Sequence, residues 1–532
     1  MPDLNGFNLE EVTIAELQNH YSEGHFSIEA YTAFCLDRIR CINPYVEAVI
    51  ETNPDALDIA RSLDQDRMHG VHVCPMHGVP ILVKDNVATK DRMQTTAGSW
   101  ALLGNVVPED AFVVRKLRQE RAVILGHANM SEWASVRSKA YSTGYSPRGG
   151  QVRNPFDLRR TPFGSSSGSA VVVSANLVPV SLGTETDTSI IGPASINGVV
   201  GFKPTVGLTS RSGVIPISEN MDSVGTLGRT VADAVAGLDA IVGADDRDRF
   251  TVVADRQQKG PYSGHISNRE VLKGARFGLP IKRCWELCPA DCQAVASRVL
   301  DAIREAGATI IEVDLPSIEE RTSPDGGWDW EHGDPDKSEW TVAKVDTYNG
   351  INAYLSSLTQ TSIKSLEDVL EYNKQNPGTE GATPGEVPAF PTGQDNLLEI
   401  INCHGQKDAV YESALKHIQK QTRDNGIDAA LKYHDPESEF EAQLDALLFC
   451  DRRGIGQQYA AQAGYPIVCI PIGLDAKGLP VSLFIQHSAW KEDQLVKWAS
   501  AIGDLWNAKH GWRATPTFKH LTAKNIPILG LG

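Results

Sequence analysis

Residues 161–170 read TPFGSSSGSA, and three consecutive serines stand there between glycines. Three interpretations of the stretch are open. It is a flexible linker, or a strand-to-helix turn of the G-x-S-x-G type that carries a nucleophilic serine, or one part of a serine catalytic apparatus of another design. Because a linker predicts no chemistry and the other two predict a folded enzyme, this stretch decides both fold and function.

The linker interpretation is weakened by the neighbouring sequence. The Ser/Gly run is only six residues long and leads into the apolar segment 170–182, which must be buried. On its other side, residues 141–168 are rich in Gly, Pro, Ser and Asn and show little periodicity. A loop of this length inside a compact domain is usually functional when both of its ends are anchored. The serines are therefore expected to belong to a functional loop.

The second interpretation has a literal motif behind it, since residues 164–168 are G-x-S-x-G with Ser166 at the nucleophile position. In an α/β-hydrolase this motif follows a buried strand, and an acid and then a histidine come later in the chain. Here the preceding residues, NPFDLRRTPF, carry charges and prolines and do not predict a buried strand. Asp445 and His487 lie in strand-like contexts, and they keep this alternative open.

The third interpretation draws on residues outside the serine run. Lys84 stands in VPILVKDNV (79–87), a short apolar run that predicts a buried strand. Burial disfavours the charged ammonium and lowers its pKa, so such a lysine is a candidate base. It could instead snorkel to the surface or pair with Asp85. Downstream, the polar turn before Ser189 offers successive backbone N–H groups that can accept an anionic oxygen.

Helical and strand patterns alternate along the chain. Thr13 and Glu16 form a capping box, and Ser27 can cap a helical run through residue 39. A helix to about residue 120 precedes a strand at 122–125, and residues 444–449, 465–474 and 479–487 read as strands before a helix that follows Asp493. This alternation predicts an α/β sheet covered by helices. Residues 320–395 differ in composition and read as an insertion or cap.

Composition excludes several functional classes. The 532 residues carry a net charge of −17, which argues against a nucleic-acid partner. The longest apolar stretch, 170–182, is too short to cross a membrane, and the N-terminus does not resemble a secretory signal. We therefore expect a cytoplasmic enzyme. Cys284, Cys288 and Cys292 have helical spacing without a nearby histidine, which favours buried thiols on a helix face over a metal site.

Several motifs in one order resemble the amidase signature family. They are PILVKDNVATKDRMQTTAGS, the Gly-Ser loop and GTETDTSI…PA…G, joined by GYSPRGGQVRNPFDL, GVVGFKPTVGLTSRSGVIPIS and DSVGTLGRTVADA. The likeness is strong over residues 70–240 and weaker elsewhere. It is greatest to the branch of bacterial peptide amidases and related fungal and plant amidases. The resemblance implies a mixed central β-sheet with helices on both faces and a helical cap.

The same resemblance implies one domain over residues 1–532. Its parts would be N-terminal helices (1–75), a signature core (76–240), the cap or insertion (320–395), and C-terminal strands and a helix (440–532).

The resemblance also assigns roles to three residues. Lys84 falls on the family's general base, Ser165 on the bridging serine at a cis peptide bond, and Ser189 on the nucleophile, 24 residues after Ser165. The implied reaction is hydrolysis of a carboxamide C–N bond through an acyl-enzyme on Ser189. Ser166 and Ser167 would mainly support the loop. No metal or cofactor is implied, the partner is a small amide, and the protein is a monomer or a homodimer.

The implied oxyanion hole consists of backbone N–H groups of the turn before and at the nucleophile, namely Thr186, Asp187, Thr188 and Ser189.

Three positions depart from the family pattern. Thr188 stands where the family usually has glycine, so either the turn keeps a negative φ here or the pocket is remodelled. Ile191 replaces a frequent arginine, and Gly192 replaces a Cys or a bulkier residue. These changes keep acyl transfer, esterase activity, and a catalytically weak binding scaffold or partner subunit open as alternatives.

Substrate contacts are less determined by the sequence. Ala134 falls at a position that lines substrate in relatives. Aromatic residues of the 320–395 segment are candidates for substrate contacts or simply pack the cap; they are Trp328, Trp330, Trp340 and Tyr348. The histidines at 127, 404 and 487 are expected to be structural.

Overall fold

The computed structural model describes residues 3–71, 74–255, 260–321, 328, 334–380, 389–434, 441–450, 454–511, 514–523 and 527–528. Trp330 lies outside these residues.

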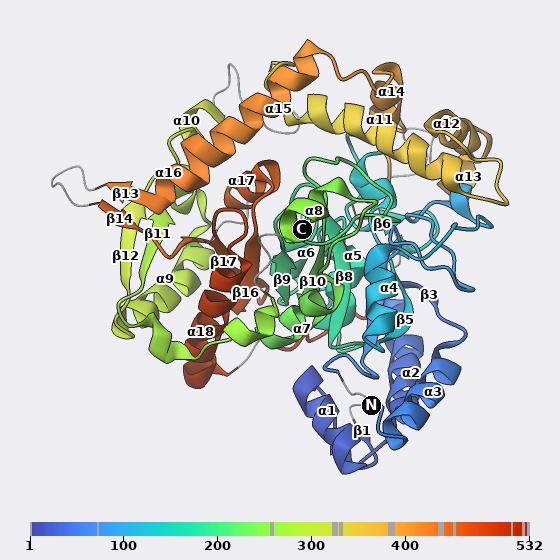
Figure 1. The fold of residues 1–532 in the computed structure, drawn as a ribbon, viewed down its shortest axis with the longest axis horizontal. Helices are drawn as coiled ribbons and strands as arrows, with labels where there is room; N and C mark the ends of the chain where they lie inside the picture. Colours follow the sequence, from blue (N-terminus) through green and yellow to red (C-terminus); the bar gives the residue numbers. More distant parts are fainter. Residues whose placement is uncertain are drawn as a thin grey trace.

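Among the described residues, eleven strands form one mixed sheet at the centre of the molecule (Figure 1). Its order is β12-β11-β15-β17-β16-β9-β10-β8-β4-β5-β3. The pairs β4–β5, β4–β8, β11–β12 and β11–β15 are parallel, and the other pairs are antiparallel. The strands are β3 (Val49–Thr52), β4 (Pro80–Lys84), β5 (Val123–Ala128), β8 (Val180–Glu185), β9 (Val200–Lys203), β10 (Ser223–Gly228), β11 (Arg276–Pro280), β12 (Thr309–Val313), β15 (Ala446–Phe449), β16 (Ile467–Leu474) and β17 (Pro480–Gln486).

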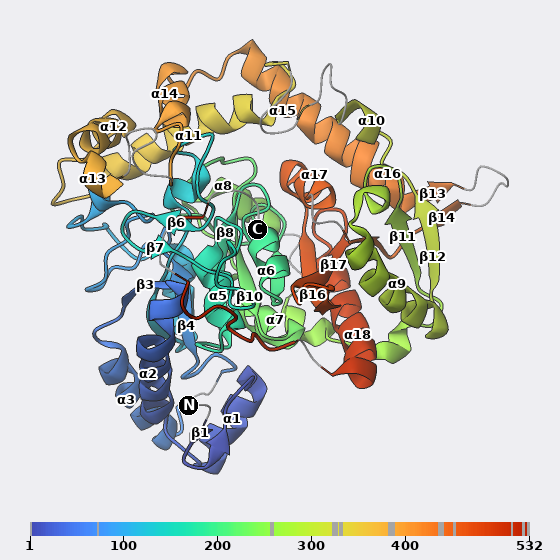
Figure 2. The same cartoon turned by 180° about the vertical axis from the view of Figure 1, so that it is seen from behind.

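Helices cover both faces of this sheet, and the buried apolar side chains accordingly divide into two clusters. One cluster contains side chains of α5 and α6, and the other contains side chains of α7, α9 and α18. Figures 1 and 2 show these two helical layers from opposite sides. The helices named are α5 (Ser167–Ser174), α6 (Ile191–Ile196), α7 (Val231–Ile241), α9 (Ala290–Glu305) and α18 (Glu492–His510). The mixed sheet with helices on both faces confirms the predicted fold class.

The N-terminal helices begin where the sequence predicts. Thr13 and Glu16 form the capping box of α1 (Ile14–Glu23), and the Ser27 side chain caps α2 (Ile28–Val46). These helices and α3 (Ala56–Met68) form a group near the β3 edge of the sheet (Figure 1). A further helix, α4 (Phe112–Gln119), precedes β5.

Strand β5 runs three residues beyond the predicted end at 125. Gly126 lies inside the strand, and a Cβ there would lie 2.3 Å from the Glu51 carbonyl oxygen of β3. The glycine therefore allows β3 to pair closely with β5.

A layer of helices forms an arch beside the sheet (Figures 1 and 2). It begins at Ile318, just before the predicted 320–395 segment, and continues past residue 395. It anchors to the core loop 216–222, since Asp346 accepts hydrogen bonds from Ser218 Oγ at 2.7 Å and Asn220 Nδ2 at 2.9 Å. The helices are α10 (Ile318–Arg321), α11 (Glu339–Ser357), α12 (Leu366–Gln375), α13 (Pro377–Glu380), α14 (Asp395–Asn402), α15 (Ala409–Thr422) and α16 (Asp428–Leu431), with α17 (Ile455–Ala463) beneath and α8 (Arg249–Asp255) near the core.

The remaining strands are three short hairpins outside the main sheet. They are β1 (Asp3–Leu4) with β2 (Phe7–Asn8), β6 (Tyr145–Ser146) with β7 (Gly150–Gln151), and β13 (Lys432–His434) with β14 (Glu441–Gln443).

The cysteines at 284, 288 and 292 do not share one helix face, so that part of the prediction is wrong. Pro289 separates a short 3₁₀ helix (Trp285–Leu287) from α9, and only Cys292 lies in α9. All three are buried, and Cys288 Sγ lies 3.7 Å from Cys450 Sγ. Within the described ranges, no cluster of His, Cys, Asp or Glu side chains is arranged to hold a metal ion.

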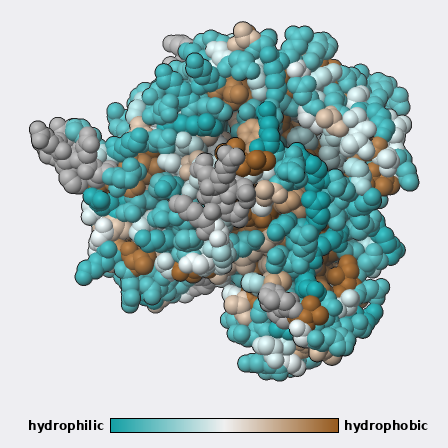
Figure 3. Space-filling view, viewed as in Figure 1, coloured by the Kyte–Doolittle hydropathy of each residue, from teal (hydrophilic) through white to brown (hydrophobic). Residues whose placement is uncertain are grey.

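The face of the molecule in Figure 3 is largely hydrophilic, with apolar side chains in small scattered groups. No helix in the described part of the chain is long and apolar enough to cross a bilayer.

Candidate active site

Lys84 is the last residue of β4, a strand whose five residues are all buried between β5 and β8. The side chain is fully buried, and its Nζ lies 2.8 Å from Ser165 Oγ. Nζ also contacts the carbonyl oxygen of Thr184 at 3.0 Å and the Thr184 hydroxyl at 2.9 Å. The lysine therefore neither snorkels to the surface nor pairs with Asp85, which instead binds His127 at 2.9 Å.

Burial lowers the pKa of Lys84 from 10.5 to about 7. Desolvation is the largest cause, and the nearby carboxylates of Glu185 and Asp222 oppose it only in part. The amine therefore loses its proton near neutral pH far more readily than an exposed lysine does. A neutral amine in hydrogen-bond contact with a serine hydroxyl has the properties of a general base.

Ser165 is held by the loop that precedes α5. The peptide bond between Gly164 and Ser165 is cis, and the side chain of Ser165 is buried. The carbonyl oxygen of Ser165 accepts the Ser131 N–H at 3.1 Å. Gly164 cannot be replaced without rearrangement, because a Cβ there would lie 2.3 Å from Ser131 Oγ.

The next two serines fix this loop. Ser166 Oγ donates to the Thr184 carbonyl oxygen at 3.0 Å, and Ser167 Oγ donates to the Phe163 carbonyl oxygen at 2.6 Å. Both side chains are fully buried. These contacts agree with the supporting role expected for Ser166 and Ser167.

Ser189 lies in the turn between β8 and α6 and is only partly buried. Its carbonyl oxygen accepts the Ser166 N–H at 3.0 Å, so the turn lies against the serine loop. Its hydroxyl donates to the Asp187 carbonyl oxygen at 3.4 Å rather than to Ser165. The structure thus brings Lys84 and Ser165 into direct contact and places Ser189 on the adjoining backbone.

The turn presents N–H groups of the kind that bind an oxyanion. In the described part of the chain, the N–H groups of Thr188 and Ser189 donate to no acceptor. The next two, of Ile190 and Ile191, donate to the Glu185 carboxylate at 2.6 and 2.9 Å. Glu185 therefore fixes the far side of the turn, where the N–H groups are already used.

Thr188 adopts a φ of 57°, so the first of the two alternatives, a turn that keeps a negative φ, is wrong. This left-handed conformation is strained for a β-branched residue. The Thr188 side chain points toward the start of α17, since a Cβ at Gly454 would lie 3.7 Å from Thr188 Cγ2.

Packing explains why residue 192 is a glycine. A Cβ on Gly192 would lie 2.5 Å from the Phe163 ring, so the aromatic side chain occupies the space of a larger residue at 192. Ile191 is fully buried at the start of α6.

The alternative with Ser166 as an α/β-hydrolase nucleophile is wrong. Loop precedes the motif, and no strand leads into it. Asp445 precedes β15, which is separated from β8 by four strands of the sheet. Five strand spacings of about 4.8 Å each give a separation of roughly 24 Å. His487 follows β17, four strand spacings from β8, and it cannot reach Ser166 either.

The predicted substrate contacts fall in different places. Ala134 lies on the loop whose Ser131 contacts Ser165. Trp328 is fully buried and packs edge-on against Tyr459, with ring centroids 5.7 Å apart. Trp340 Nε1 donates to Glu399 at 2.8 Å, and Tyr348 donates to Glu367 at 3.1 Å. These contacts favour packing of the helical layer over contact with substrate.

The predicted structural histidine at 127 is fully buried, and His487 is buried as well. His404 has a left-handed φ of 49° just after α14.

Two site residues were missed at the sequence level, Thr184 and Glu185. Thr184 binds the lysine, and Glu185 binds the turn after Ser189. Both are buried polar residues at the end of β8, which continues the apolar run at 170–182. This anomaly is the same signal that singled out Lys84, and it could have identified them.

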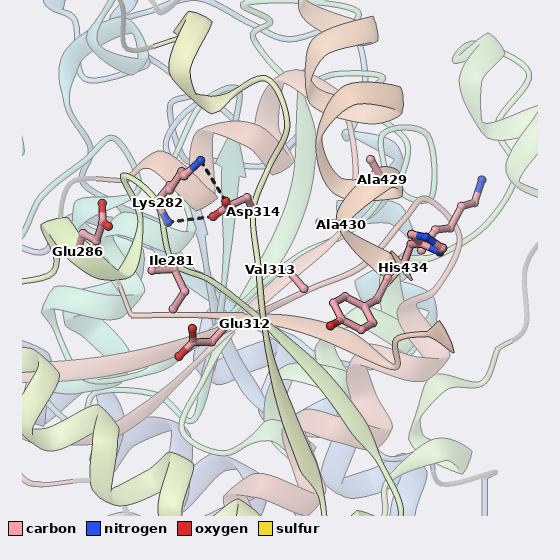
Figure 4. Close-up of a pocket in the computed structure, with 11 residues that line it drawn as sticks. Ile281, Lys282, Glu286, Glu312, Val313, Asp314, Ala429, Ala430 and His434 are labelled. Atoms are coloured by element: carbon pink, nitrogen blue, oxygen red, sulfur yellow. Dashed lines mark hydrogen bonds and ion pairs between the residues drawn. The ribbon is translucent and has the colours of Figure 1, made fainter. Parts of the chain in front are cut away.

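A separate hollow lies elsewhere, beside β12 and the β13 hairpin (Figure 4). Its volume is about 460 Å³, and charged side chains such as Lys282, Glu286 and Asp314 line it. Seven strand spacings, on the order of 30 Å, separate β12 from β8. This hollow is therefore not part of the lysine–serine site.

Comparison with known proteins gives a consistent result. The family model described as Amidase matches residues 30–326. A Schizosaccharomyces pombe protein named "Putative amidase C869.01" is 47% identical over 531 residues, covering 99% of this chain and 90% of that protein. The native peptide amidase from Stenotrophomonas maltophilia matches with a TM-score of 0.84 and 36% identity, covering 96% of this chain and 99% of that one.

A plant relative, a probable amidase from Arabidopsis thaliana, is 38% identical over 503 residues, which cover 93% of this chain and 90% of that protein.

Taken with the mixed sheet and the buried lysine–serine pair, these matches show that the chain belongs to the amidase family and is a hydrolase that acts on amides.

Proposed function

We propose that this protein cleaves carboxamides through an acyl-enzyme on Ser189, with Ser165 as proton relay and Lys84 as general base. The observation that carries the proposal is the fully buried Lys84 amine, 2.8 Å from Ser165 Oγ, with a pKa lowered to about 7. No other described lysine both contacts a serine hydroxyl of this loop and has its pKa brought so near neutrality.

The partners of the amine define its orientation when it is neutral. A neutral amine has two N–H groups and one lone pair. Thr184 offers two acceptors, its carbonyl oxygen at 3.0 Å and its hydroxyl oxygen at 2.9 Å. With both N–H groups used there, the lone pair is left to accept the Ser165 hydroxyl proton.

The reaction then proceeds in two halves. Ser165 gives its proton to Lys84 and takes one from Ser189, whose Oγ attacks the carboxamide carbon. The Ser189 hydroxyl now donates to Asp187, so a rotation about its χ1 must bring it toward Ser165 when substrate binds. Ser165 passes the proton to the leaving amine, and water repeats the sequence on the acyl-enzyme.

Developing charge on the substrate oxygen is accepted by N–H groups of the turn. The proposal assigns this role to Thr186, Asp187, Thr188 and Ser189. The unused N–H groups of Thr188 and Ser189 support it most directly. Removing one such donor typically costs about 3–4 kcal/mol in transition-state stabilisation.

The substrate is a small carboxamide, and Ala134 stays a proposed substrate contact. Since one structural neighbour is named a peptide amidase, C-terminal peptide amides are the first candidate substrates to assay. Amino-acid amides and aryl amides complete the panel. Cytoplasmic location, a monomeric or homodimeric state and a single-domain organisation stay predictions from the sequence.

The proposal is tested by quenching the enzyme during turnover of this panel and locating acyl adducts by mass spectrometry. An adduct on Ser189, absent from Ser189→Ala and retained in Ser166→Ala, supports the proposal. An adduct on Ser166, or full turnover by Ser189→Ala, would overturn it. Product analysis with added amine separates hydrolysis from acyl transfer, and an ester panel tests the esterase alternative.

A further inference from the structure

A small cavity lies beside Thr184, one of the two residues that contact the Lys84 amine. Its volume is about 10 Å³, which is room for the centre of a single water molecule. Its polar lining comes from Asn86, Thr184, Thr186, Arg211, Asp222 and Ser223, and the rest of its lining is apolar. Neither a substrate nor a larger ion fits in this space.

Two polar atoms of the lining have no partner in the part of the chain that the structure describes. Asn86 Oδ1 and Ser223 Oγ are buried and make no hydrogen bond among the described residues. The side chains of both residues are almost completely enclosed, at 2% and 1% exposure. Buried polar atoms nearly always have a hydrogen-bond partner, so we expect one for each of these two atoms.

The orientation of the Asn86 amide follows from its other contacts. Its Nδ2 lies 3.4 Å from the Ile215 carbonyl oxygen, which only accepts, and 3.0 Å from the Thr184 hydroxyl oxygen. The amide nitrogen must therefore face these two groups. Its oxygen is consequently the unpaired atom, and it requires a donor.

We propose that one buried water molecule occupies this cavity, donates to Asn86 Oδ1, accepts from Ser223 Oγ, and thereby holds the Asn86 amide against Thr184. The Asp222 carboxylate, which lines the same cavity, offers an acceptor for the second hydrogen of the water. Such a water has the two to four polar partners that buried waters typically have.

The proposed water affects the lysine–serine site through Thr184. Asn86 fixes the Thr184 hydroxyl, and that hydroxyl holds one N–H of the Lys84 amine. Asn86 and Ser223 are then positioning residues that keep the amine lone pair aimed at Ser165. This inference rests on the proposed role of Lys84 as the base.

The first test is a high-resolution crystal structure of the wild-type enzyme. The expected result is an ordered water peak within hydrogen-bond distance of Asn86 Oδ1 and Ser223 Oγ. An empty cavity, in a map that shows other buried waters, would overturn the proposal.

The second test compares Ser223→Ala with Ser181→Ala. Ser181 is an equally buried serine on β8, but its hydroxyl donates to the Ser169 carbonyl oxygen, away from the cavity. Loss of one hydrogen bond in the positioning set should lower kcat threefold to tenfold in Ser223→Ala, with KM unchanged. The apparent pKa of the kcat/KM profile should rise, because a loosened Thr184 hydroxyl accepts more readily from the charged amine. Ser181→Ala should show neither effect.

Equal kcat and identical pH profiles for Ser223→Ala and wild type would contradict the positioning role. The two proposals fail separately. If the water is present but Lys84→Met keeps full activity, the base assignment fails and the water site stands. If Lys84 is essential but the cavity is empty, only the water site fails.

Discussion

Replacing Lys84 by methionine should inactivate the enzyme and stabilise its fold at neutral pH. Methionine has a similar length and carries no charge. The three residues that precede position 84 in β4, Ile81, Leu82 and Val83, are fully buried and apolar. The folded protein lowers the pKa of this lysine from 10.5 to about 7, a difference of about 3.5 units. At 1.36 kcal/mol per unit, this corresponds to about 5 kcal/mol of folding free energy.

Removal of the amine also removes its hydrogen bonds, which reduces this gain. The Thr184 carbonyl and hydroxyl oxygens keep donors, from Ser166 Oγ and Asn86 Nδ2 respectively. Only the Ser165 hydroxyl loses its partner, at a cost of about 1–3 kcal/mol. The variant should therefore be about 2–4 kcal/mol more stable than wild type at pH 7.

The sign of the pH dependence follows from the proton count. Between pH 7 and pH 10.5 the unfolded chain holds a proton on Lys84 that the folded chain does not, so wild-type stability rises with pH in this window. The penalty is complete below about pH 7 and vanishes above about pH 10.5. The advantage of Lys84→Met should therefore shrink by about 1.4 kcal/mol for each pH unit across that window.

Urea-induced unfolding, followed by tryptophan fluorescence at pH 7, 8, 9 and 10, measures this difference. Lys416→Met, at an exposed position on α15, controls for the loss of a lysine as such. A Lys84→Met variant that is less stable than wild type at pH 7, or an advantage that stays constant with pH, would refute the reasoning.

Two further predictions concern the departures from the family pattern. Thr188→Gly removes about 1–3 kcal/mol of backbone strain from a left-handed β-branched residue, and the freedom of glycine in the unfolded chain costs about 0.5–1 kcal/mol. Denaturation should therefore show a net gain in stability of about 1 kcal/mol. A loss of stability would mean that the packing of the Thr188 side chain outweighs its strain. Gly192→Ala should lower the stability of the fold by about 1–3 kcal/mol, because the new Cβ would clash with the Phe163 ring. Adding Phe163→Ala to the same chain should recover part of that loss. If the losses of the two substitutions are additive, the clash is ruled out.

The sequence predicts the central part of the fold because local patterns there agree with burial. The apolar run at 79–87 contains β4, and the three C-terminal runs contain β15, β16 and β17. Lys84 was identifiable because a charge inside an apolar strand is an anomaly. The resemblance then paired it with Ser165, across 81 residues of chain, a contact that no periodicity predicts.

Other features depend on tertiary contacts that spacing does not encode. The i, i+4 spacing of Cys284, Cys288 and Cys292 reads as a helix, but Pro289 divides the segment. The positive φ of Thr188 contradicts local preference and is maintained only by the surrounding turn. The fully buried Trp328 shows that aromatic residues in a polar segment can pack a core.

The central claim is that the neutral Lys84 amine activates Ser189 through Ser165. The rate of covalent labelling by a fluorophosphonate probe, measured against pH and mapped by mass spectrometry, tests it most directly. We predict labelling at Ser189, a rate that rises with pH through an apparent pKa of about 7, and a loss of roughly 10²–10⁴-fold in Lys84→Met. Labelling at another serine, or a rate that is independent of pH and of Lys84, would contradict it.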